Sequence, residues 1–473
     1  MMEEACKLPS LSSSMKSNED VFEKMSVGEA VRTMAVPAVA AQLIVLIYNL
    51  ADTFYVGRTN NPWMVAGVSL ILPLFNVAVA VGALFGAGGG ALLPRLLAVD
   101  RKDEATRVSA YCLRLGLLTA AAFALLILLF MRPLLHLLGA GENTYGYARQ
   151  YVLMVLVLGG IPTICSNVLS NLIRSLGLSR ESGIGVALGG VLNLVLDPLF
   201  MFLILPKGNE VLGVGIATLL SGIISCSYCL FVFRKKQKVI GVNLTAPLPE
   251  AESRRRVFLV GIPSSIGGLL FDLDYMVLDR LMSGYGDIPL AAIGIVLKAE
   301  RLPQQTGIGL CQAMVPLVAY SYAKKDFRRV RRIMARILGI GLVMALISIT
   351  VYELFPHQIM RLFIADPATL EIGAEFLRIR SLAAGIMFFC FFVVFLYQAI
   401  GNGVMSMALV VLRWLVLNIP MLFLLNRLMG MYGLVWSQVI SDVISVILSY
   451  AILAKSMKSW QSESEREGER IGQ

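Results

Sequence analysis

Four oxygen-bearing side chains stand inside long apolar segments of this chain. They are Asp52 in YNLADTFYVGR, Asn193 and Asp197 in LNLVLDPLF, and Thr218 in GVGIATLLS. Asn193 and Asp197 are four residues apart and therefore share one helical face. Carboxylate, amide and hydroxyl oxygens suit a proton or Na⁺, and an ionisable group at membrane depth commonly marks an ion path. The four residues are predicted to form a cation-coupling site, and a metal site if the cation is Na⁺.

The depth of these residues supports the prediction. Counted at about 1.5 Å per residue, all four fall in the outer half of the membrane and in the first half of the chain. Two neighbouring carboxylates in a low dielectric suit a pair that must load and unload a proton. The alternative is that Asp52 sits at the end of its helix, solvated among lipid headgroups.

A second set of polar residues is predicted to line a substrate cavity. Gln42 and Asn49 are seven residues apart, close to two helical turns, and so face the same way. Tyr48 beside them is an aromatic ring that could hold a lipophilic cation. Asp272 and Asp274 are two residues apart and therefore cannot share a helical face. One of the two is expected to face the cavity.

Other charges within apolar segments favour structural roles. Asp279, the expected repeat counterpart of Asp52, abuts Arg280 and is predicted to be solvated at the outer helix end. The sequence LKAER places Glu300 between Lys298 and Arg301, which favours an internally compensated cluster. Arg413 is expected near the inner helix end, where a long side chain can snorkel.

The helices that must carry these residues follow from composition. The chain has 473 residues, 57% of them hydrophobic and only 15% charged, against about 25% charged in an average soluble protein. Apolar runs of about 20 residues predict twelve transmembrane helices, near residues 34–56, 63–86, 108–131, 150–172, 184–205, 211–233, 257–281, 288–317, 333–355, 374–398, 405–426 and 432–454. The fold class is therefore an all-α membrane protein.

The net charge of +10 comes from short loops between the apolar runs. Lysine and arginine concentrate in the loops that follow every second run, the arrangement of cytoplasmic loops in membrane proteins. This distribution argues against a nucleic-acid partner and places both termini in the cytoplasm. The partners expected are a small organic substrate and the lipid bilayer.

The two halves of the chain repeat each other. Pro37 in AVPAVAAQL matches Pro263 in VGIPSSIGG, 226 residues later, and other matches follow at nearly the same offset. Two parallel six-helix bundles that rock against each other would open a central cavity to alternate sides. The predicted division is a disordered tail (1–25), an N-terminal lobe (26–233), a basic linker (234–256), a C-terminal lobe (257–455) and a second tail (456–473).

Several segments resemble the multidrug and toxic compound extrusion (MATE) family. They are YNLADTFYVGR, LNLVLDPLF, GVGIATLLS, RSLGLS and QAIGNG. The resemblance covers roughly residues 26–455 and implies a MATE-type antiporter that exports organic cations against H⁺ or Na⁺. By position, Asp52, Asn193, Asp197 and Thr218 match the cation-site residues of prokaryotic members. The resemblance implies no cofactor, and a location in the inner (plasma) membrane of a prokaryote.

Two other functional classes fit the sequence less well. A flippase for lipid-linked oligosaccharides or lipids would need a strongly cationic cavity, whereas acids outnumber cations inside the apolar runs here. A membrane-embedded enzyme is disfavoured because the chain has only two histidines, His136 and His357, and no grouping that indicates a catalytic or metal site. The prediction is a monomeric transporter and no enzymatic activity.

Overall fold

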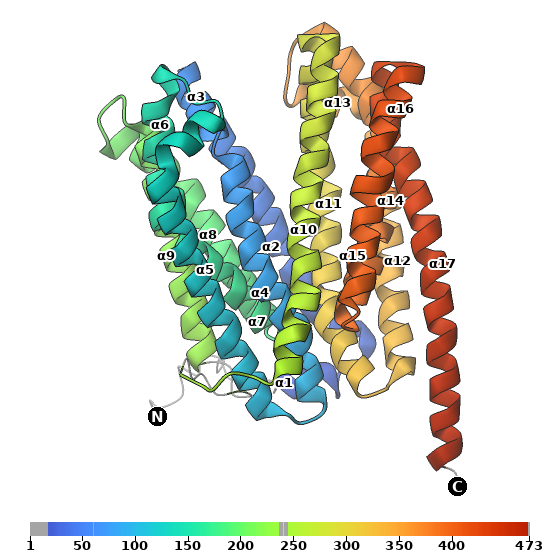
Figure 1. Ribbon diagram of the computed structural model, residues 1–473. Helices are drawn as coiled ribbons and strands as arrows, with labels where there is room; N and C mark the ends of the chain where they lie inside the picture. Colours follow the sequence, from blue (N-terminus) through green and yellow to red (C-terminus); the bar gives the residue numbers. More distant parts are fainter. Residues whose placement is uncertain (1–17, 60, 236–239, 241–244, 472–473) are drawn as a thin grey trace, which may run out of the picture.

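A computed structural model of the chain describes residues 18–59, 61–235, 240 and 245–471. Its N-terminal lobe consists of the helices up to the basic linker (Figure 1). These are α1 (Asn18–Phe22), α2 (Val27–Gly57), α3 (Pro62–Ser69), α4 (Leu72–Ala98), α5 (Lys102–Leu137), α6 (Glu142–Val152), π-helix η1 (Leu153–Leu158), α7 (Gly160–Ser175), α8 (Ser179–Pro198), π-helix η2 (Leu199–Ile204) and α9 (Glu210–Lys235).

The C-terminal lobe repeats this plan. Its elements are α10 (Ala251–Met282), the 3₁₀ turn η3 (Ser283–Tyr285), α11 (Asp287–Ala323), α12 (Phe327–Leu354), α13 (Pro356–Arg361), α14 (Pro367–Ala399), α15 (Gly403–Val411), π-helix η4 (Leu412–Asn418), α16 (Ile419–Met429) and α17 (Met431–Ile471). The second predicted tail is thus helical as far as Ile471. The part of the predicted linker at 236–239 and 241–244 lies outside the described residues.

The all-α membrane architecture is confirmed. Within the described ranges, ten helices are long and apolar enough to cross a membrane, and the pair Glu142–Leu158 and Gly160–Ser175, bent by 44°, makes an eleventh. The remaining predicted span, the eighth (288–317), corresponds to α11, which has 37 residues but is not apolar enough to count among these helices. Polar residues such as Lys298, Glu300 and Gln312 interrupt it, as expected for a helix that faces other helices or water.

The two lobes meet at one end of the molecule and diverge at the other (Figure 1). The meeting end carries α1 and is called the α1 end; the diverging end carries α3 and is called the α3 end. About midway along α10, Ser265 donates to the Ala80 carbonyl of α4 at 2.6 Å. Gly309 of α11 fits against α2 so closely that a Cβ there would lie 2.8 Å from the Cα of Val39. Small residues thus allow the close approach of helices from different lobes.

Residues 18–25 differ from the predicted disordered tail. α1 packs on the C-terminal lobe, where the Phe22 ring stacks on Tyr320 with centroids 4.9 Å apart. The Tyr320 hydroxyl donates to Glu23 at 2.6 Å, and Lys324 lies 3.1 Å from the same carboxylate. The segment therefore links the start of α2 to the opposite lobe.

Candidate functional site

The N-terminal lobe holds a polar cluster between α2, α8 and α9. The Asn193 side-chain amide donates to Asp197 Oδ1 at 3.2 Å and to Thr218 Oγ1 at 3.2 Å. Asp52 of α2 lies within hydrogen-bonding range of Asp197. Asn193 and Asp197 are 3% and 0% exposed. The structure thus brings the four predicted residues together from three separate helices, and we call them the N-lobe cluster.

Backbone features of α8 position this cluster. Gly190 has no side chain, and a Cβ at this residue would lie 2.8 Å from Ile44 and 2.9 Å from the Tyr48 ring, so α2 can pack directly on α8. Pro198 cannot donate to the Leu194 carbonyl one turn earlier. The Tyr55 hydroxyl of α2 donates to that carbonyl at 3.5 Å. The chain then continues as the π-helix η2, a form often found at functional sites.

Three buried oxygens of the N-lobe cluster have no hydrogen-bond donor: Asp52 Oδ1, Asn193 Oδ1 and Asp197 Oδ2. A buried acceptor without a partner costs about 1–3 kcal/mol. Two charged carboxylates about 4 Å apart also repel by about 4 kcal/mol at an effective dielectric of about 20. A proton or an oxygen-seeking cation would relieve both costs, and the donor set fits either.

Two tyrosines stand beside this cluster. Tyr48 of α2 interacts electrostatically with Asp52 and with the neighbouring Asn49 side chain. Tyr151 of α6 interacts with both Asp52 and Asp197, and its side chain is buried. Sequence reasoning proposed Tyr48 but missed Tyr151, because nothing in the sequence of α6 indicates which helix it faces.

Gln42 and Asp272 lie at the boundary between the lobes and not in the N-lobe cluster. The Gln42 amide donates to Gln312 Oε1 of α11 at 3.0 Å, and buried Arg174 of α7 donates to the same oxygen at 2.6 Å. Asp272 is half-buried, and its carboxylate interacts with the Asn76 side chain of α4. Of the predicted cavity residues, these two face the opposite lobe.

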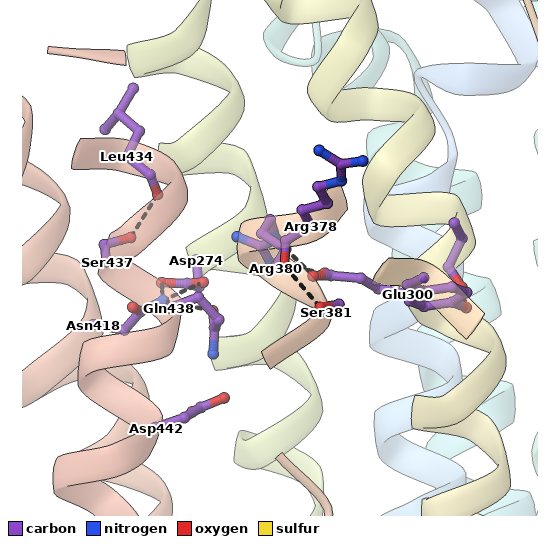
Figure 2. A network of polar contacts seen from close by, with 12 residues as sticks. Asp274, Glu300, Arg378, Arg380, Ser381, Asn418, Leu434, Ser437, Gln438 and Asp442 are labelled. Atoms are coloured by element: carbon purple, nitrogen blue, oxygen red, sulfur yellow. Dashed lines mark hydrogen bonds and ion pairs between the residues drawn. The ribbon is translucent and has the colours of Figure 1, made fainter. Parts of the chain in front are cut away.

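Asp274 lies inside the C-terminal lobe and not on a cavity wall as predicted (Figure 2). The Asn418 amide contacts both carboxylate oxygens of Asp274 at 2.7 Å and Gln438 Oε1 at 3.0 Å. The reason is helical geometry, since Asp272 and Asp274 point to opposite sides of α10. Asp274 is thus the acid that faces into its own lobe.

The C-terminal lobe therefore contains a polar cluster that is comparable to the N-lobe cluster. Asn418 of the fifth span donates to Asp274 of the first long helix and to Gln438 of the sixth span, as Asn193 donates to Asp197 and Thr218 in the N-terminal lobe. Asp274, not Asp279, is the acid of α10 that joins this cluster. Asp279 is exposed, as the sequence predicted.

Two buried ion pairs distinguish the C-terminal lobe. Arg380 of α14 binds Glu300 of α11 through two hydrogen bonds of 2.7 and 2.8 Å, and both side chains are 1% exposed (Figure 2). Arg413 of η4 binds Asp442 of α17 at 2.8 and 3.1 Å.

These pairs correct two predictions. Glu300 is compensated across helices and not by its neighbours in sequence, and Arg413 is buried and paired and does not snorkel. A buried charge needs an opposite partner to offset its desolvation. Arg380 and Asp442 were missed because a single sequence shows that both charges exist but not which charge each one meets.

The comparisons with known proteins agree with this architecture. The sequence profile of the MatE family matches residues 37–199 and 263–424. The two matches begin 226 residues apart and end 225 residues apart. The same profile thus covers both halves of the chain, at the repeat offset that Pro37 and Pro263 predicted.

Relatives and solved structures extend over nearly the whole chain. The multidrug export protein MepA of Staphylococcus saprophyticus is 28% identical over 432 residues, which are 91% of this chain and 94% of MepA. MepA of Staphylococcus aureus strain MRSA252 is 27% identical over the same length and coverage.

Among solved structures, an outward-facing conformation of a multidrug resistance MATE family transporter of the MOP superfamily superposes with a TM-score of 0.89. It is 21% identical, and the match covers 94% of this chain and 99% of that one. A crystal structure of MATE in complex with MaD3S has the same TM-score at 22% identity, with the same coverage. The structural likeness shows a shared fold, and the profile match to both halves shows that this chain belongs to the MATE family of membrane transporters and is not an enzyme.

Proposed function

We propose that this chain is a secondary active antiporter that exports lipophilic cationic drugs or toxins in exchange for H⁺ or Na⁺. The observation that carries the proposal is the N-lobe cluster, in which two carboxyl groups, Asp52 and Asp197, meet with three buried oxygens that lack donors. The names of the relatives, which are multidrug export proteins, support the substrate class.

The proposed cycle uses the two lobes as rocking bodies. With the cavity open outward, Asp52 and Asp197 accept H⁺ or Na⁺, which removes their mutual repulsion, and α2 shifts so that the drug leaves. With the cavity open inward, the cation is released and a new drug enters. Thr218 and the Asn193 carbonyl would complete an oxygen cage if the cation is Na⁺.

The remaining cavity residues have proposed roles as well. Tyr48 offers its ring to a lipophilic cation, and Asn49 and Gln42 supply polar contacts along α2. Asp272 contacts the opposite lobe, so it senses the separation of the lobes, and Asp274 holds the C-terminal lobe together around Asn418.

The proposal includes an orientation. The basic loops after α4, α9 and α11 support an orientation with the α1 end and both termini in the cytoplasm of a bacterial cell, by the positive-inside rule. The exporter works as a monomer in its plasma membrane.

The test is transport of ethidium by purified protein in proteoliposomes, with pH and Na⁺ gradients imposed separately. We expect one gradient to drive uptake and Asp52→Asn to abolish it. Asp279→Asn is the matched control, because it removes an exposed acid from the first long helix of the other lobe. Full transport by Asp52→Asn would disprove the role of the N-lobe cluster, and flipping of a lipid-linked sugar would support the flippase alternative.

A further inference from the structure

α11 carries two exposed cations at membrane depth. Lys298 and Arg301 are both exposed, and they are three residues apart on one helical face. Glu300, between them in sequence, points away and binds buried Arg380. Counted from Asp287 at the α3 end, Lys298 and Arg301 lie roughly 16 and 21 Å along the helix. A cation at such depth is expensive in lipid and normally faces the protein interior or a water-filled cavity.

The side of α11 that bears these cations faces the N-terminal lobe. Lys298 lies eleven residues before Gly309, and Arg301 lies eleven residues before Gln312, a separation of about three helical turns. Gly309 packs on Val39 of α2, and Gln312 is hydrogen-bonded by Gln42 of α2. Lys298 and Arg301 therefore continue this stripe toward the α3 end, where the lobes diverge (Figure 1).

The positive charge of Lys298 and Arg301 is not balanced by the described residues around them. Asp272 of α10 interacts electrostatically with Arg301 and lies close to Asn76 of the opposite lobe. Among the described residues, Lys298 has no hydrogen bond and no ion pair. One carboxylate thus offsets two cations, and among the described residues the side of α11 that bears them has an excess of positive charge.

This excess is opposite in sign to the acids of the N-lobe cluster. A purely cationic substrate would gain nothing from Lys298 and Arg301, whereas a carboxylate would gain charge-assisted hydrogen bonds. We infer that Lys298 and Arg301 form a subsite for the carboxylate of amphiphilic substrates that also carry a cationic group. The inference rests on the proposed export function and names the residues that select among its substrates.

The test compares two probes that differ only in this group: rhodamine 110, which carries a free carboxyl group, and rhodamine 123, its methyl ester. Binding to the full-length protein in detergent is measured by fluorescence polarisation. We expect the double variant Lys298→Gln, Arg301→Gln to raise the Kd for rhodamine 110 by roughly tenfold, the value of one charge-assisted hydrogen bond. The Kd for rhodamine 123 should change less than twofold.

Two further variants sharpen the outcome. Asp272→Asn removes the competing carboxylate and should lower the ratio of the Kd for rhodamine 110 to the Kd for rhodamine 123. Arg280→Gln removes an exposed arginine from the α3 end of α10 and should alter neither probe.

Equal effects of the double variant on both probes, or none on rhodamine 110, would overturn the inference. The failure of the proposed function would look different, because the unmodified protein would then not transport rhodamine 123 in proteoliposomes at all. All variants change exposed or half-buried side chains, so their thermal unfolding midpoints should match that of the unmodified protein and thereby exclude misfolding.

Discussion

Glu300 and Arg380 illustrate how single buried charges are held in this protein. Each side chain is 1% exposed, and two hydrogen bonds join the carboxylate to the guanidinium. Neither charge could remain buried alone, because the desolvation of an unpaired ion amounts to several kcal/mol. The pair joins α11 to α14 behind the face that carries Lys298 and Arg301, so it holds that face in place without reaching it.

A substitution at Glu300 should therefore be severe. We expect Glu300→Gln to lower the free energy of unfolding by about 3–5 kcal/mol, because it leaves Arg380 buried and uncompensated. Thermal unfolding of the detergent-solubilised protein measures the effect, with Asp279→Asn as the exposed control. Adding Arg380→Met to Glu300→Gln should recover most of the loss. Equal midpoints for Glu300→Gln and the control would contradict this account of the pair.

At the scale of elements, close helix contacts decide where the functional side chains meet. α2 reaches the N-lobe cluster because Gly190 offers no side chain where Ile44 and Tyr48 pack. Likewise the chain continues past Pro198 as η2, and the Tyr55 hydroxyl of α2 donates to the Leu194 carbonyl that the proline leaves without a donor. The position of Asp52 relative to Asp197 thus depends on the packing of two helices.

Gly190→Ala should disturb this packing. The added Cβ would lie 2.8 Å from Ile44 Cγ2, so α2 must shift, at a cost of about 1–3 kcal/mol for overpacking. Export should fall even though no member of the N-lobe cluster is changed. Gly294→Ala in α11 is the control, since a Cβ there meets nothing within 4 Å. Unchanged export by Gly190→Ala would show that the helix spacing is not critical.

The contact between Glu23, in the segment between α1 and α2, and Tyr320 is expected to stabilise the protein in a pH-dependent way. The hydrogen bond from Tyr320, together with Lys324, holds the pKa of Glu23 below its ordinary value of 4.5. The contact therefore contributes stability above about pH 4.5 and loses it as the pH falls through the lower pKa of the folded state.

Tyr320→Phe should lower the thermal unfolding midpoint slightly at pH 7, because Glu23 is half-exposed and such contacts contribute only up to about 1 kcal/mol. The difference from the unmodified protein should shrink at pH 4 and below. Glu23→Gln added to Tyr320→Phe should cause little further loss at pH 7. A constant difference across this pH range would show that Glu23 does not contribute.

At the scale of the whole molecule, the lobes are joined near the α1 end and separated near the α3 end (Figure 1). Arg174 and Gln42 of the N-terminal lobe share the Gln312 oxygen of the C-terminal lobe, and Ser265 bonds to the Ala80 carbonyl. Opening toward the α1 end would have to break these bonds. The proposed transport cycle therefore requires them to form and break in each turnover.

Cysteines at positions 42 and 312, in a variant without the native cysteines, test this requirement. A short bifunctional thiol reagent that bridges them should stop ethidium transport, because the lobes can no longer separate at the α1 end. Each single-cysteine variant treated with the reagent should keep transporting. Transport by the bridged double variant would exclude rocking about this contact.

The sequence by itself determined the membrane class, the position of most helices and the two-fold repeat. These properties depend on local composition and on matches along one chain, such as the 226-residue offset between Pro37 and Pro263. It also identified the N-lobe cluster, since an acid, an amide and a hydroxyl in apolar segments at equal depth have few other places to meet.

Only the tertiary structure decided which side chains meet across helices. It placed Asp274 inside its lobe, paired Glu300 with Arg380 and Arg413 with Asp442, and left Lys298 and Arg301 exposed on α11. The physical reason is that helical spacing gives the relative direction of two residues on one helix, but the rotation of each helix depends on everything that packs around it.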